Sequence, residues 1–150
     1  MSVRRGKEED VQQLVSLYTA FFEEHNHFNK SHDQIVMYLK EKMQEHDLYV
    51  SEKDGVLKGA LFLILKSRGE HAHWKLRHFA FDSLEAAEEL LVEVEKRVQE
   101  ESATAKIELT IAENEEGMPF YEEHGYKREA VLANHYRWGE ACYVYGKSFG

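Results

Sequence analysis

The sequence predicts a mixed α/β domain, and three features of its hydrophobic pattern carry that prediction. Residues 57–66 are apolar on both faces, which is typical of a central strand. Residues 106–111 alternate apolar and polar side chains, which is typical of a strand with one buried face. Residues 84–102 repeat apolar side chains at spacings of three and four, which predicts a long amphipathic helix. Strands and helices therefore share one core.

The composition fits one domain over residues 1–150. Hydrophobic residues make up 43% of the chain, enough for a single sizeable core. No apolar run approaches the roughly 18 residues of a membrane-spanning helix, and the first ten residues lack a signal peptide's apolar segment. The single cysteine, Cys142, has no partner for an internal disulfide, which is typical of a reducing compartment. We expect a cytoplasmic protein with no membrane partner.

The charge balance bears on the class of ligand. The formal net charge is −9, with 28 acidic residues against 19 lysines and arginines. Nonspecific binding to nucleic acid depends on clustered lysine and arginine, so no nucleic acid partner is expected. A cationic small molecule or a basic peptide fits this charge better.

The first third of the chain predicts a strand and two helices. Residues 2–5 form a short strand, and the acidic residues 8–10 suit the start of the helix that runs to about residue 24. Ser31 and Gln34 predict a capping box for the second helix. Two amphipathic helices in succession are therefore expected before the first hairpin.

The middle of the chain predicts a hairpin, a further strand and the long helix. Asp54 and Gly55 are the preferred pair for a tight hairpin turn. In the strand over residues 74–81, His78 is expected on the face opposite Lys75 and Arg77, and Phe79 on their face. Asp82 with Glu85 predicts the cap of the next helix.

The last third predicts a strand, a short helix and two further strands. Pro119 suits only the first turn of a helix, so this helix begins close to Met118 and ends at Gly125. Strands follow around residues 128–132 and 140–149. The last one is rich in aromatic side chains and would be an exposed edge unless it is paired, covered or used for homodimerisation.

Asn114, Tyr121, Gly125 and Tyr126 resemble a signature of the GNAT superfamily of N-acetyltransferases. In that signature an Asn is followed seven positions later by Tyr-Glu, two further residues, Gly and Phe, and Tyr126 here replaces the Phe. The opening strand and helix and the last two strands are also similar to the family. The resemblance implies the GNAT-like acyl-CoA N-acyltransferase fold, with a central, mixed, mostly antiparallel sheet flanked by helices.

The resemblance also implies an activity and its residues. The activity is acetyl-CoA-dependent transfer of an acetyl group to a primary amine, with Tyr121 protonating the departing coenzyme A thiolate. Asn114 and Tyr121 would line the cofactor cleft. The backbone of Phe79, Ala80 and Phe81 would meet the pantetheine amides.

His25, His27 and Phe28 lie in the loop that borders the acceptor site in the family, so they are expected to bind substrate. A polyamine, an aminoglycoside-like amine and a peptide N-terminus all remain open as acceptors. His71 and His73 are spaced so that both point one way from a strand, but no Cys or Asp cluster completes a zinc site, and no metal is expected.

The sequence departs from the family at the cofactor phosphates and at the base. The family's basic, glycine-rich loop is missing, and Glu85, Glu88 and Glu89 stand near the place where the phosphates should arrive. Where many members place a Glu on the fourth strand, this chain offers Lys75 and Arg77. Coenzyme A therefore binds weakly or differently, or the chain is a non-catalytic GNAT-like domain that binds a ligand or a partner.

Overall fold

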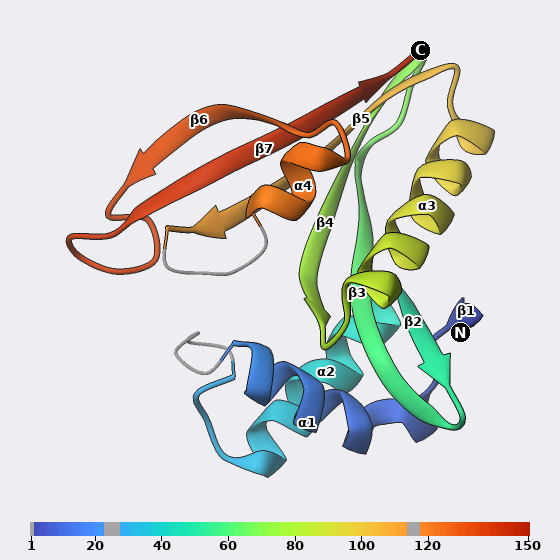
Figure 1. Cartoon of the computed structure of the whole chain (residues 1–150), viewed down its shortest axis with the longest axis vertical. Helices are drawn as coiled ribbons and strands as arrows, with labels where there is room; N and C mark the ends of the chain where they lie inside the picture. Colours follow the sequence, from blue (N-terminus) through green and yellow to red (C-terminus); the bar gives the residue numbers. More distant parts are fainter. Residues whose placement is uncertain (1, 23–27, 114–117) are drawn as a thin grey trace. The chain divides into compact units, whose positions relative to one another are not determined.

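The computed structural model describes residues 2–22, 28–113 and 118–150 (Figure 1). Within these residues the strands form one sheet in the order β1-β2-β3-β4-β5-β7-β6. The elements follow the chain as β1 (Ser2–Arg5), the 3₁₀ turn η1 (Glu8–Asp10), α1 (Val11–Phe21), α2 (His32–Glu45), β2 (Asp47–Lys53), β3 (Val56–Ser67), β4 (His71–Phe81), α3 (Leu84–Glu101), β5 (Thr104–Ala112), α4 (Met118–Glu123), β6 (Lys127–Ala133) and β7 (Ala141–Phe149).

The predicted fold class is confirmed, because the sheet is mixed and mostly antiparallel. Strands β1, β2 and β3 pair antiparallel in sequence, and β7 pairs antiparallel with both β5 and β6. Strands β4 and β5 run parallel, with pairs from His71 with Thr104 to Lys75 with Glu108. The fourth and fifth strands are therefore neighbours, as the resemblance requires.

Two compact units divide the chain. The first comprises residues 1–64 and 78–97, and the second residues 65–77 and 98–150. Each unit buries apolar side chains of its own. No helix in the described ranges has the length and apolar character to cross a membrane. The single domain expected over residues 1–150 stays a prediction.

The first unit ties β1 to the start of α1 through a buried ion pair. The Arg4 guanidinium donates to both carboxylate oxygens of Asp10 at 2.8 Å, and Arg4 Nε donates to Glu52 at 2.7 Å. The Lys7 backbone N–H also donates to Asp10, at 2.9 Å. The Asp10 side chain is only 6% exposed. Hydrogen bonding to Arg4 outweighs burial and holds the pKa of Asp10 below its usual 3.8.

The core of the first unit lies between α1, α2 and the strands β2 and β3. The predicted capping box of α2 is present, since Ser31 and Gln34 exchange hydrogen bonds between side chain and backbone. The predicted hairpin turn is also present, with left-handed φ angles of 52° at Asp54 and 80° at Gly55. The largest core side chains share this cluster: Leu14, Tyr18, Phe28, Leu39 and Phe62.

Helix α3 begins differently from the prediction. Ser83 rather than Asp82 caps it, because the Ser83 hydroxyl accepts from the Ala86 backbone N–H at 3.2 Å. Asp82 instead lies 3.5 Å from the Lys58 ammonium. In the first unit α3 packs close to β3 at Gly59, where a Cβ would stand 2.9 Å from a Leu90 methyl. A larger side chain at this glycine would require the Leu90 side chain to shift.

The second unit joins β5, β7 and β6 to the short helix α4. At the end of α4 the Gly125 N–H donates to the Glu122 carbonyl and the Tyr126 N–H to the Tyr121 carbonyl. Gly125 has a φ of 89°, so this is the left-handed stop that the sequence predicts. The Tyr145 hydroxyl of β7 donates to the Glu122 carboxylate at 2.9 Å. This bond fastens the helix to the sheet.

The last strand of the chain is paired on both sides. Strand β7 lies between β5 and β6, so the exposed edge is β6 and the aromatic side chains of β7 are not left at an edge. The two tryptophans of this unit differ sharply in exposure. Trp74 on β4 is 3% exposed, whereas Trp138 in the turn before β7 is 91% exposed.

Candidate functional site

The backbone of β4 carries an irregularity at His78. Its φ is 50°, in the left-handed region that a side chain with a Cβ rarely adopts. The predicted alternation holds from Trp74 to Arg77 and then fails, because His78, Phe79 and Ala80 are buried in succession. The placement of Phe79 on the face of Lys75 and Arg77 stays a prediction. The left-handed φ of His78 coincides with the end of the regular alternation of buried and half-buried side chains.

His78 is held in an aromatic enclosure within the first unit. Its Nε2 atom lies 2.6 Å from the Tyr38 hydroxyl, and the residue is 8% exposed. The edges of its ring meet Phe28 at a centroid distance of 5.0 Å and Phe62 at 6.1 Å. Backbone strain costs about 1–3 kcal/mol and persists where the surroundings impose it. Packing and the Tyr38 hydrogen bond supply that constraint here.

Tyr18 also packs in this enclosure, and its hydroxyl has an unusual environment. Its ring stacks on Phe28 at a centroid distance of 4.8 Å and meets His78 at 6.0 Å. The hydroxyl is buried, and no described residue accepts or donates a hydrogen bond to it. Burial raises the pKa of Tyr18 well above its usual 10. The phenol is therefore neutral at every physiological pH.

Tyr121 lies on α4 with a buried side chain, 3% exposed. Its ring meets Phe120 and Tyr126 edge-on, at centroid distances of 5.4 and 6.0 Å. Its carbonyl accepts from Tyr126, so the left-handed stop at Gly125 fixes the residue in place. The short helix therefore presents Tyr121 from a rigid end. Asn114, which the sequence pairs with it, lies outside the described residues.

The expected substrate residues fall at the end of the loop after α1. Phe28 is 2% exposed and stacks on Tyr18 and Phe22. Its side chain packs in the core of the first unit and offers little surface to a ligand. His25 and His27 lie outside the described residues.

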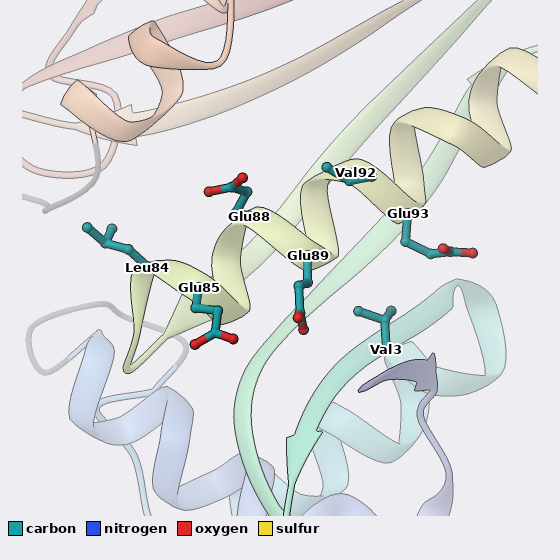
Figure 2. A pocket seen from close by; sticks show the side chains of 7 residues that line it. All are labelled: Val3, Leu84, Glu85, Glu88, Glu89, Val92 and Glu93. Atoms are coloured by element: carbon teal, nitrogen blue, oxygen red, sulfur yellow. The ribbon is translucent and has the colours of Figure 1, made fainter. Parts of the chain in front are cut away.

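The first turns of α3 border a hollow of about 690 Å³ within the first unit. Every charged side chain around it is a carboxylate, as Figure 2 shows. The Leu84 and Val92 side chains are 65% and 59% exposed beside these carboxylates. The lining consists of Val3, Leu84, Glu85, Glu88, Glu89, Val92 and Glu93. Phosphates arriving here would meet negative charge.

Several polar side chains of the second unit lie on strands β4 and β5. Their ladder stops after Lys75 and Glu108, so the strand edges beyond that pair are not joined to each other within the unit. His73 and Lys106 lie 3.6 and 4.0 Å from the Glu108 carboxylate. Next on β5, the Thr110 hydroxyl lies 2.7 Å from the Tyr136 hydroxyl.

Solved structures place this architecture among known folds. No family model matches the sequence, and no curated protein matches it. The aminoglycoside 6'-N-acetyltransferase from Enterococcus faecium superposes with a TM-score of 0.77 at 18% identity, over 99% of this chain and 97% of that one. The chain has the fold of the GNAT N-acetyltransferases. Its β4–β5 pairing and its helix order are those that the resemblance implied.

Two further matches extend across the GNAT fold. An aminoglycoside 6'-N-acetyltransferase complexed with coenzyme A superposes with a TM-score of 0.79 at 19% identity, covering 99% of this chain and 97% of that chain. The ribosomal-protein-alanine N-acetyltransferase from Brucella melitensis gives 0.74 at 12% identity, over 99% and 100%. The match spans the whole length of each protein.

Sequence reasoning missed the enclosure around His78. Tyr18 of α1 and Phe22, the residue just after α1, stand four positions apart, which already predicts that both face the core. The contact of Tyr38 with His78 joins residues 40 positions apart, and no local spacing signals it.

Proposed function

We propose that the protein is an acetyl-CoA-dependent N-acetyltransferase that acts on a primary amine. The single observation that carries this proposal is the match of the complete GNAT fold to acetyltransferases, one of them complexed with coenzyme A. The Asn114 to Gly125 spacing adds support from the sequence.

The described residues suit the pantetheine chain of coenzyme A better than its phosphates. The β4–β5 ladder ends at Lys75 and Glu108, so backbone groups beyond it remain for a pantetheine chain. Phe79, Ala80 and Phe81 continue β4 past this point and are the proposed backbone contacts.

The phosphate end of the cofactor fits less well. Glu85 and Glu88 stand in the first turns of α3, and no described arginine or lysine lines the hollow beside them. Like charges at this place oppose phosphate binding. We therefore propose that acetyl-CoA binds more weakly than the fold usually provides.

The proposed transfer needs three events at the thioester. The neutral amine nitrogen attacks the carbonyl carbon, the carbon–sulfur bond breaks, and the ammonium proton leaves to solvent. Tyr121 is the proposed acid, which gives its proton to the departing sulfur and takes a proton back from solvent. Asn114 is the proposed neighbour in the cofactor cleft, and His25 and His27 are the proposed acceptor side.

Calorimetric titration with acetyl-CoA, followed by mass spectrometry of amines incubated with protein and acetyl-CoA, tests the proposal. We expect binding in the micromolar to millimolar range and a mass increase of one acetyl group on at least one amine. No heat at millimolar cofactor would contradict the proposal and favour a ligand-binding domain without catalysis.

A further inference from the structure

Lys75 and Arg77 are two charged side chains of the second unit that form no ion pair with any described residue. They lie two residues apart on β4, between the buried Trp74, Leu76 and His78, so both project from the same half-buried face. No carboxylate of any described residue lies within 4 Å of either cation. Two neighbouring cations without a partner repel each other, and burial adds to the cost.

The neighbouring charges on β5 are already paired. Glu108, which stands opposite Lys75 on β5, has its carboxylate 3.6 Å from His73 and 4.0 Å from Lys106. Lys106 also pairs with Glu129 of β6. Among the described residues Lys75 and Arg77 thus have no carboxylate partner, in a chain whose acidic residues outnumber its lysines and arginines by 28 to 19.

The surroundings of Lys75 disfavour its charge. Burial first, and then the charges of Arg77 and Lys66, lower the pKa of Lys75, while Glu108 opposes the shift. A bound anion would stabilise the charged form of Lys75, because its negative charge would offset the effects of burial and of the Arg77 and Lys66 charges. Perturbed ionisable groups of this kind gather at functional sites.

We propose that Lys75 and Arg77 bind the carboxylate of the acceptor, and that the acceptor is therefore an amine that also carries a carboxylate, such as an amino acid. The identification of the ligand as the acceptor rests on the proposed acetyl transfer. Arginine binds a carboxylate through two parallel hydrogen bonds, and the ammonium of Lys75 adds a second charge from one strand position away.

Two features favour a carboxylate over a phosphate of the cofactor. Glu108 lies opposite Lys75 and would repel a dianionic phosphate, whereas it attracts the amino group of a zwitterion. The cation pair also stands at the end of the β4–β5 ladder, beyond which the backbone contacts of the pantetheine chain are proposed. Polyamines and aminoglycosides carry several positive charges and would be repelled at this point.

A binding experiment tests the anion site without turnover. N-acetylglycine and N-methylacetamide share the acetamide and differ only in the carboxylate, and neither has a nucleophilic amine. In a ¹H–¹⁵N NMR titration at low salt, N-acetylglycine is expected to shift the amide signals of residues 73–77 and 106–110, and N-methylacetamide is not. Lys75→Met and Arg77→Gln should each abolish the shifts. The control Lys58→Met removes a β3 lysine already paired with Asp82 and should change nothing.

A kinetic experiment tests the assignment to the acceptor. Lysine and cadaverine carry the same amines, but only lysine has a carboxylate. We expect kcat/KM for lysine to exceed that for cadaverine by about tenfold or more, and Arg77→Gln to remove this preference, since a charge-assisted hydrogen bond is lost. Equal rates for the two amines in the wild-type protein would overturn the inference.

Two outcomes separate this inference from the proposed function. If N-acetylglycine shifts the signals but no amine is acetylated, the anion site stands and the acetyltransferase proposal fails. If Arg77→Gln weakens coenzyme A but not dephospho-coenzyme A, the cations hold a cofactor phosphate and the acceptor assignment is overturned. Absence of shifts with N-acetylglycine, in a protein that does acetylate amines, removes the site alone.

Discussion

The Tyr38 hydroxyl lies 2.6 Å from Nε2 of His78, and this contact joins α2 to the strained position of β4. The bond is buried, and the rings of Phe28 and Phe62 close around it. A left-handed backbone at a residue other than glycine is held by such surroundings. The stability of this contact therefore determines how firmly the β4 backbone keeps its turn at His78.

Tyr38→Phe and Tyr18→Phe should have opposite effects on stability. The first removes the hydrogen bond to His78 and should lower the free energy of unfolding by about 1 kcal/mol. The second removes a buried hydroxyl that has no partner among the described residues, so it should leave stability unchanged or raise it by up to about 1 kcal/mol. Urea denaturation followed by circular dichroism measures both. Equal losses in the two variants would show that the hydrogen bond contributes nothing.

Asp10 should make stability depend on acid pH. Because its folded pKa lies below 3.8, its contribution is complete above that pH and is lost as the pH falls through the folded pKa. Asp10→Asn should cost about 2 kcal/mol at pH 7, because Arg4 loses a bidentate partner. The difference from the wild-type protein should shrink below pH 3.8.

The control for this prediction is Asp33→Asn. The Asp33 side chain is 99% exposed, so its removal should not change the unfolding curve at any pH. A difference between wild type and Asp10→Asn that stays constant from pH 7 to pH 2.5 would contradict the role given to the ionised carboxylate.

Tyr121→Phe should lower turnover without unfolding the protein. The ring stays packed against Phe120 and Tyr126, so the melting temperature should move little. Loss of a general acid typically costs about 10²-fold in rate or more, and affinity for acetyl-CoA should be nearly unchanged. Initial rates and calorimetry on the two proteins measure both quantities. A variant that acetylates as fast as the wild type would leave Tyr121 a core aromatic only.

Glu85→Gln combined with Glu88→Gln should tighten coenzyme A. Glu85 and Glu88 both line the acidic hollow at the first turns of α3 (Figure 2). Their removal weakens the electrostatic repulsion of phosphates, which should raise the affinity for coenzyme A by roughly two- to tenfold at low salt. Glu100→Gln near the other end of the helix removes one carboxylate that does not line the hollow and should have no effect. Unchanged affinity in the double variant would place the phosphates elsewhere.

Local signals in the sequence predicted most of the fold, and distant contacts explain the rest. Asp54 with Gly55, Ser31 with Gln34, and Gly125 each act within four residues, so their turn, cap and stop follow from the sequence itself. The period-2 pattern of residues 106–111 likewise predicted β5.

The cap of α3 was predicted from the wrong residue. Asp82 and Ser83 are both good caps, and the choice depends on Lys58, which lies 24 positions away in the chain and pairs with Asp82. Local propensity does not distinguish two adjacent candidates when a distant residue decides between them.

The turn at His78 and the surplus charge of Lys75 and Arg77 were missed for the same reason. Alternation extrapolates a strand as regular, and only the packing of Tyr38 and Phe28 against His78 imposes the irregular backbone. Lys75 was expected on one face with Arg77 and Phe79, but its lack of a carboxylate depends on where Glu108 points. Neither feature can be predicted from a short stretch of sequence.

The contrast between Trp74 and Trp138 provides an internal optical probe of the second unit. Trp138 is 91% exposed, so a neutral quencher such as acrylamide should extinguish its fluorescence, whereas Trp74 at 3% exposure should keep a blue-shifted emission. Trp74 lies next to Lys75 on β4, so binding or unfolding around the cation pair should change the protected component. The two residues thus allow surface and interior events to be followed separately in one sample.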